Sequence, residues 1–228
     1  AAAVWRCIPR AGPHNDATMA SVLLVSLNRE TEPYPVFPVG PWMLRHHLRA
    51  RGVDADVADL YLLGSLDALE REYLAGRAYD FIGLSIRNVD NLAWPGVVSY
   101  LPEIREAVAR VRRHYPAERV ILGGAGYSIF GARLAEALGL PPGVAGAGET
   151  ALGERLGGAP AAGDAPDFSY HQDAAPEALQ RYYRDGGMLG IQSRRGCPFA
   201  CTYCTYPLIE GRALQLRFDK RAPFLVRG

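Results

Sequence analysis

The chain has 228 residues, of which 49% are hydrophobic and 21% are charged, and its formal net charge at pH 7 is +1. This size suits one globular domain, or one domain with part of a second. The near-neutral charge gives no electrostatic basis for binding nucleic acid or an acidic membrane surface. No apolar run approaches the roughly 20 residues that cross a bilayer, so we expect no membrane span.

The amino-terminal residues 1–18 lack the apolar core of a signal peptide. We expect them to form a disordered leader, with Met19 as a candidate natural start. Three of the four cysteines are clustered near the other end of the chain. This pattern is typical of a metal or redox site in a reducing compartment, and not of a disulfide framework. The sequence therefore predicts a cytoplasmic protein.

Strand-like and helix-like segments alternate through the first two thirds of the chain. The run 21–27 is apolar almost throughout, as expected for a strand that is buried on both faces. The predicted strands are 21–27, 53–60, 80–86, 119–124 and a short strand within 143–148. The predicted helices begin near Pro41, Ser65, Pro102, Ser128 and Glu149.

Five strand–helix units in succession predict an α/β fold, with a parallel sheet and helices on both faces. We expect a Rossmann-like, flavodoxin-like domain over residues 19–157, with five strands in the order 2-1-3-4-5. A ligand binds such a sheet beyond the carboxyl ends of its strands. The loops after strands one, three, four and five are therefore the candidate binding loops.

Residues 158–187 are dominated by Gly, Ala, Pro and Asp, and this composition predicts a linker. Residues 188–193 have the pattern of a new strand, which leads directly into the cysteine loop. We therefore assign residues 188–228 to the start of a second domain.

Two glycine clusters follow the fourth and fifth predicted strands, within 123–130 and 146–150. Glycines at strand ends would let a large flat ligand approach the backbone closely. Ordinary turn chemistry explains either cluster alone, but two clusters on one rim, beside Ser85 and Asn88, favour a binding site. The first loop is rich in proline, where a dinucleotide-binding fold has a short glycine-rich turn. The sequence therefore disfavours NAD.

Cys197, Cys201 and Cys204 have the spacing C-x3-C-x2-C. A structural zinc site needs a fourth ligand, and no histidine lies within a few residues of this loop. A [4Fe-4S] cluster held by three thiolates would leave one iron open to another ligand. Arg194 and Arg195 would favour the thiolate forms. The pattern therefore favours an iron–sulfur cluster over zinc.

The segment RGCPFACTYC resembles the C-x3-C-x-aromatic-C signature of radical S-adenosylmethionine enzymes. The upstream segments YPVFPVG, GLSIRN, GGAGYSIF and GAGET resemble, in the same order, loops of the cobalamin-binding domain that precedes some of these enzymes. Residues 20–217 are thus similar to the cobalamin-binding radical S-adenosylmethionine family.

This resemblance implies three cofactors, which are cobalamin, a [4Fe-4S] cluster and S-adenosylmethionine. Cys197, Cys201 and Cys204 would ligate the cluster, and Tyr203 would lie near the adenine of S-adenosylmethionine. The residues implied to line cobalamin are Pro35, Pro38, Gly40, Ser85, Arg87, Asn88, Gly123, Gly124, Gly126, Tyr127, Ser128, Gly146, Gly148 and Glu149.

The resemblance also implies a reaction, most often methyl transfer. In this family a 5'-deoxyadenosyl radical abstracts hydrogen from the substrate, and methylcobalamin donates the methyl group. The implied partners are a small-molecule or peptide substrate and an electron donor such as flavodoxin or ferredoxin.

Two features depart from the family pattern. The D-x-H-x-x-G motif, which places a histidine under cobalt in other cobalamin enzymes, is absent. Only the first strand and cluster loop of the expected partial β/α barrel fall within residues 188–228. An alternative interpretation is thus a truncated chain that binds cobalamin as a module without turnover. We expect little or no methylase activity from the 228 residues alone, because a barrel is needed to exclude water from radical chemistry.

Overall fold

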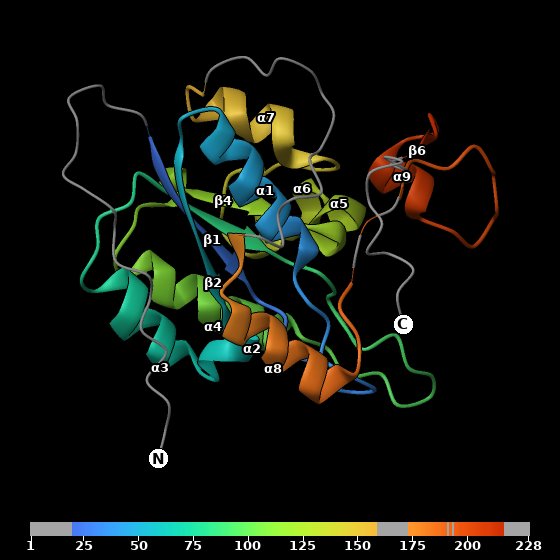
Figure 1. The fold of residues 1–228 in the computed structure, drawn as a ribbon, viewed down its shortest axis with the longest axis horizontal. Helices are drawn as coiled ribbons and strands as arrows, with labels where there is room; N and C mark the ends of the chain where they lie inside the picture. The colour runs from blue at the N-terminus through green and yellow to red at the C-terminus, as the bar shows by residue number, and fades with distance from the viewer. Residues whose placement is uncertain (1–19, 159–172, 191, 193, 217–228) are drawn as a thin grey trace.

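A computed structural model describes residues 20–158, 173–190, 192 and 194–216 (Figure 1). Its centre is a sheet of four parallel strands in the order β2-β1-β3-β4. The strands are β1 (Ser21–Ser26), β2 (Asp54–Asp59), β3 (Phe81–Ser85) and β4 (Val120–Gly123). The predicted leader, residues 1–18, lies outside the described residues.

The carboxyl ends of the four strands meet at one edge of the sheet. Ser26 is in register with both Asp59 and Ser85, and Ser85 is in register with Gly123. All loops that follow the strands therefore leave from the same side, as the parallel topology requires.

The predicted fifth strand, within 143–148, does not form among the described residues. Val144 donates a backbone hydrogen bond of 2.8 Å to the Leu122 carbonyl. The preceding Gly143 instead donates to the hydroxyl of Tyr127 at 2.6 Å. A side chain at Gly143 would overlap the Leu122 carbonyl, so this segment crosses β4 too closely to extend the sheet. The sheet thus has four strands in place of the expected five, and these four have the expected order.

Helices cover both faces of the sheet, with α1 and α7 on one side and α3 and α4 on the other (Figure 1). The helices around the sheet are α1 (Val39–Ala50), α2 (Leu60–Leu63), α3 (Leu66–Leu69), the π-helical turn η1 (Glu70–Leu74), α4 (Leu101–Arg112), the 3-10 turn η2 (Ala117–Arg119), α5 (Ala125–Phe130), α6 (Ala132–Ala137) and α7 (Gly148–Arg155).

The alternation of side chains along β1 joins the sheet to both helical layers. Val22 and Leu24 belong to a buried cluster with residues of α1 and α7. Leu23 and Val25 belong to a larger cluster that includes residues of α3 and α4. Because successive side chains of a strand point to opposite faces, a continuous apolar run is needed to supply both cores.

Of two predicted helix starts, Ser65 is confirmed and Ser128 is wrong. Ser65 caps α3 as predicted, because its hydroxyl accepts a 3.1 Å hydrogen bond from the Ala68 amide. Ser128 is not a cap but lies inside α5. Gly131, with φ of +53°, separates α5 from α6, so the single helix expected over this region is divided into two.

The predicted linker contains a helix, α8 (Pro176–Gly186), that packs on the sheet domain. Pro176 stands in its first turn, and Gly187 ends it with φ of +71°. Tyr182 of α8 is 1% exposed, and its hydroxyl donates a 2.7 Å hydrogen bond to Asp59 at the end of β2. This part of the linker is therefore docked on the sheet domain. The domain boundaries themselves stay predictions.

After α8 the chain runs into the segment that carries the three cysteines. Residues 188–190 and 192 are not in a strand, and 191 and 193 lie outside the described residues. The elements that follow are β5 (Arg194–Arg195), α9 (Tyr206–Glu210) and β6 (Gln215–Leu216), with β5 and β6 paired antiparallel. In Figure 1 this segment lies beside α5.

Candidate functional site

A cavity of about 480 Å³ opens at the carboxyl edge of the sheet. Its apolar floor includes Leu24, Gly83 and Ile121, which are in register across β1, β3 and β4. A Cβ at Gly83 would lie 2.9 Å from the Leu24 side chain, so this glycine gives Leu24 its room. An isolated glycine inside a predicted strand is the sequence signal that could have identified this floor.

Most residues predicted to line cobalamin also line this cavity. They are Pro38, Gly40, Ser85, Arg87, Gly123, Gly124, Ser128, Gly146, Gly148 and Glu149. The predicted residues that are not part of its lining are Pro35, Asn88, Gly126 and Tyr127. The fold thus gathers loops from four separate parts of the sequence around a single hollow.

The glycines after β4 are required by a neighbouring loop. Gly124 has φ of +93°, and a Cβ there would lie 2.5 Å from the Ile86 carbonyl oxygen. Gly126 donates a 2.9 Å hydrogen bond to the same carbonyl, and its Cβ would lie 3.1 Å from the Arg87 carbonyl oxygen. Close packing against the loop after β3 therefore accounts for both glycines, which were expected to make room for a ligand.

Tyr127 and Ser128 connect the two glycine-rich loops of the rim. The Ser128 hydroxyl donates to the Gly124 carbonyl and accepts from the Gly146 amide, both at 2.8 Å. The Tyr127 side chain is buried, and its hydroxyl accepts from the Gly143 amide. The hydrogen bonds of these two side chains connect the two loops and stabilise the rim of the cavity.

The cysteine-bearing segment supplies the remaining wall, through Gln192, Arg195, Tyr206, Ile209 and Glu210. None of these five was predicted to line the site. Arg195 was expected to favour the cysteine thiolates, but its guanidinium forms an ion pair with Glu149 of α7. The Arg195 Nε also lies 3.6 Å from the Glu210 Oε2.

These three charged side chains are largely buried, with exposed fractions of 15% for Arg195, 9% for Glu149 and 17% for Glu210. Burial raises the pKa of Glu210, because a carboxylate loses hydration there; Arg195 opposes this increase and Glu149 adds to it. One guanidinium is thus shared by two carboxylates at the cavity wall.

The three predicted cluster ligands are not brought together as a metal site. Cys197 and Cys204 are half-buried, Cys201 is exposed, and Tyr203 is 88% exposed. Among the residues that the structure describes, no group of three or more Cys, His, Asp or Glu could hold a metal ion. The cluster and its three ligands therefore stay a prediction from the cysteine spacing.

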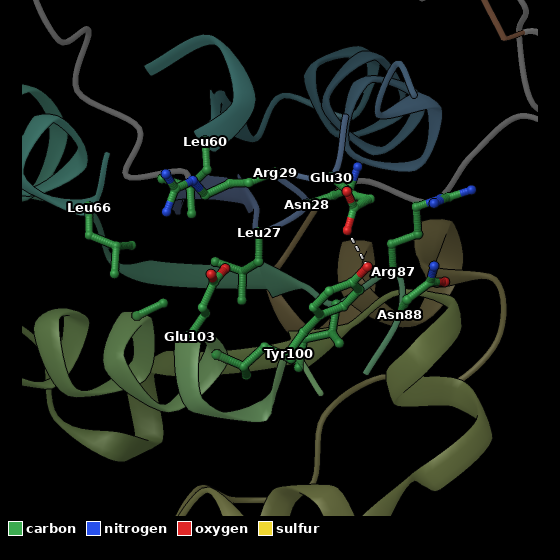
Figure 2. A pocket seen from close by; sticks show the side chains of 13 residues that line it. Leu27, Asn28, Arg29, Glu30, Leu60, Leu66, Arg87, Asn88, Tyr100 and Glu103 are labelled. Atoms are coloured by element: carbon green, nitrogen blue, oxygen red, sulfur yellow. Dashed lines mark hydrogen bonds between the residues drawn. The ribbon is translucent and has the colours of Figure 1, made fainter. Parts of the chain in front are cut away.

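A second, smaller cavity of about 250 Å³ lies on the other side of Asn28 and Arg87, which line both cavities (Figure 2). The Tyr100 hydroxyl donates to Glu30 across this cavity. Burial and the nearby Glu30 carboxylate raise the pKa of Tyr100 to about 12. The predicted residue Asn88 lines this smaller cavity.

The described part of the chain contains no helix with the length and apolar character that a bilayer crossing requires. No protein-family model matches the sequence, and no curated protein matches it. Solved structures do match, and they agree on one architecture.

The chain is similar to the radical S-adenosylmethionine methyltransferase TsrM from Kitasatospora setae, solved with cobalamin and a [4Fe-4S] cluster bound. The identity is 25% over 88% of this chain and 44% of TsrM, with a TM-score of 0.73. A second TsrM structure, with tryptophan substrate and a S-adenosylmethionine analogue, has 23% identity over 87% and 43% of the two chains and a TM-score of 0.71.

The cobalamin-dependent S-adenosylmethionine radical enzyme OxsB, with aqua-cobalamin and S-adenosylmethionine bound, shares the fold. Its identity is 16% over 82% of this chain and 28% of OxsB, with a TM-score of 0.56. The chain spans less than half the length of each of these structures. Through its fold, and through its sequence identity with TsrM, it is a structural relative of the cobalamin-binding radical S-adenosylmethionine proteins, the family that its motifs predicted.

Proposed function

We propose that this chain binds cobalamin in the cavity at the carboxyl edge of the sheet. We further propose that it forms part of a cobalamin-dependent radical S-adenosylmethionine enzyme, a methyltransferase. The observation that supports this most is the cavity itself, because loops predicted from sequence to surround cobalamin converge on it. The match to TsrM, solved with cobalamin bound, supports the same assignment.

The residues present fit a large cofactor with a flat ring and a long tail. Leu24 and Ile121 give an apolar floor, and the rim at Gly146 and Gly148 has no side chains. At Gly40, a Cβ would meet no atom within 4 Å, so the space in front of α1 is open. Bound cobalamin would supply a carrier for a methyl group. The role of this chain is to hold and orient the cofactor and to exclude water from its buried side.

The cysteine segment carries the other part of the proposal. Cys197, Cys201 and Cys204 are the proposed ligands of a [4Fe-4S] cluster, and Tyr203 is the proposed neighbour of S-adenosylmethionine. This assignment rests on the cysteine spacing and on the cluster in TsrM. A reducing protein such as flavodoxin or ferredoxin is the proposed electron donor, and the substrate is a small molecule or a peptide.

Cobalamin binding is tested by titrating the purified chain with hydroxocobalamin and following its visible absorption. Gly40→Trp places a large side chain in the open space of the cavity. We expect it to weaken binding at least about tenfold, or roughly 1.4 kcal/mol. Gly40→Ala is the matched control, because its methyl group meets no neighbour and alanine favours the helix. Absence of binding by the parent chain, or equal binding by the tryptophan variant, would contradict the proposal.

The cluster is tested separately by anaerobic reconstitution with iron and sulfide, followed by addition of S-adenosylmethionine. We expect Cys201→Ala to lose the iron–sulfur absorption and to retain cobalamin binding. A chain that binds cobalamin but forms no 5'-deoxyadenosine would act as a binding module alone. Loss of cobalamin binding in Cys201→Ala would show that the two parts are not separable.

A further inference from the structure

The cobalamin cavity is not confined to the sheet domain, because the cysteine-bearing segment forms one of its walls. From this wall we infer that Glu210 is a ligand-binding residue, whose carboxylate accepts a hydrogen bond from a primary amide at the edge of the corrin ring. Arg195 is the positioning residue that holds Glu210 at the cavity. This inference rests on the proposed cobalamin binding and names a contact within it.

The wall is attached to the sheet domain at two places. Arg195 pairs with Glu149 of α7, and both side chains are largely buried. At the second place α9 packs on α5, and the Ile209 carbonyl lies so close to Gly146 that a Cβ there would be 3.2 Å from it. Gly146 has φ of +78°, so glycine is favoured here by backbone conformation as well as by space. The segment is thus seated against the rim of the cavity.

One carboxylate oxygen of Glu210 lacks a hydrogen-bond donor in this position. Its Oε2 is buried, and among the described residues it has no hydrogen-bond partner, although Arg195 lies 3.6 Å away. The same Arg195 guanidinium already donates to Glu149. A buried carboxylate oxygen without a hydrogen-bond donor is costly, and burial raises the pKa of Glu210. A ligand that brings an N–H group to Glu210 would remove this cost.

The charge at the wall defines the chemistry of the ligand. Two carboxylates share one guanidinium, so the wall carries an excess of negative charge. The edge of the corrin ring in cobalamin carries neutral primary amides, which donate hydrogen bonds to carboxylates. An otherwise identical corrin with a carboxylate at the same position would be repelled. Glu210 is therefore expected to select the amide over the acid.

A purely structural role for Glu210 predicts a different result. If Glu210 only helped Arg195 to seat α9, its replacement would weaken binding of amide and acid forms of the ligand to the same extent. A selective contact instead changes the ratio of the two affinities. This ratio is the measurement that separates the two roles.

The experiment uses the full chain, with hydroxocobalamin and its separated monocarboxylic acid isomers as ligands. Dissociation constants are measured by absorption titration for the parent chain and for Glu210→Gln. We expect one isomer to bind the parent chain about tenfold more weakly than cobalamin, and Glu210→Gln to lose most of that difference. Glu154→Gln is the matched control, since Glu154 is exposed on α7 and is expected to retain the discrimination.

The possible failures are distinguishable. If the parent chain does not bind cobalamin, the proposed function fails, and this inference fails with it. If cobalamin binds but Glu210→Gln discriminates among the isomers as the parent chain does, only the inference about Glu210 is wrong. Equal melting temperatures of the variant and the parent chain would confirm that a change in discrimination does not come from unfolding.

Discussion

The sheet domain and the cysteine-bearing segment are stabilised in different ways. In β1, Val22, Leu23 and Val25 are fully buried, and the helices on both faces form apolar cores with them. In the cysteine-bearing segment, residues 192 and 194–216, Phe199 is 66% exposed and Leu208 is 80% exposed. Hydrophobic burial determines the fold of the domain, whereas the segment depends on a few polar contacts with its neighbour. The candidate site lies between these two regions.

The largest expected difference between the two regions is the cost of a leucine truncation. Leu122 of β4 is fully buried, and Leu122→Ala should lower the free energy of unfolding by about 3–4 kcal/mol. Leu208→Ala, the same truncation on the exposed face of α9, should change it by less than about 0.5 kcal/mol. Urea unfolding of both variants measures the contrast. Similar losses in both would mean that the segment shares the core of the domain.

The stability contributed by Asp59, the residue of β2 that Tyr182 of α8 contacts, should depend on pH. Burial raises the pKa of Asp59 to about 6 from 3.8, although hydrogen bonds from Tyr182 and Tyr61 oppose this. The folded state therefore holds a proton that the unfolded state releases, and stability from this group falls as pH rises from about 4 to about 6. The shift of about 2 units corresponds to about 2–3 kcal/mol.

Asp59→Asn cannot release this proton and is the test of that prediction. Relative to the parent chain, the variant should become more stable as the pH rises from 4 to 7, so the difference between their free energies of unfolding should increase in favour of the variant. The measurement is urea unfolding across this range, followed by tryptophan fluorescence. Parallel pH profiles for the two proteins would show that Asp59 is ionised normally in the folded state.

A small global effect is also expected for the ion pair that attaches the segment. Arg195→Met leaves Glu149 and Glu210 without their shared cation. Removing one partner of a buried ion pair is strongly destabilising where the structure cannot relax. Here the segment can detach, so the global free energy of unfolding should change by less than about 1 kcal/mol while local opening increases.

Hydrogen exchange measures this local opening. We expect faster exchange of the Cys197 amide, which donates to the Gly211 carbonyl at 3.1 Å, and unchanged exchange in β1. Faster exchange throughout the sheet would instead show that Arg195 supports the whole domain.

Much of the sheet domain was predictable because its sequence signals are local. Apolar runs between helix caps and glycine stops identify strands and helices without any knowledge of the fold. Ser65 illustrates this, because its capping bond reaches only three residues along the chain. The expected strand within 143–148 was wrong because Gly143 is drawn to Tyr127 and crosses β4 closely. That contact joins distant residues and has no local signature.

The candidate site was likewise predictable only in part. Glycine and proline loops at the strand ends indicated where a ligand binds, because parallel topology brings all strand ends to one edge. The partnership of Arg195 with Glu149 and Glu210 was not predictable, since a charge in a sequence does not name its partner. The docking of Tyr182 on Asp59 was hidden for the same reason, within a composition typical of linkers.

The amino-acid sequence alone therefore determined the succession of strands and helices, the loops at the strand ends and the family resemblance carried by the cysteine spacing. These depend on backbone propensity, side-chain periodicity and short motifs, all of which act over a few residues. Only the tertiary structure decided the shape of the cavity, the wall that the cysteine-bearing segment supplies, and the docking of helix α8. They depend on side chains that lie far apart along the chain and meet only when hydrophobic burial brings their elements together.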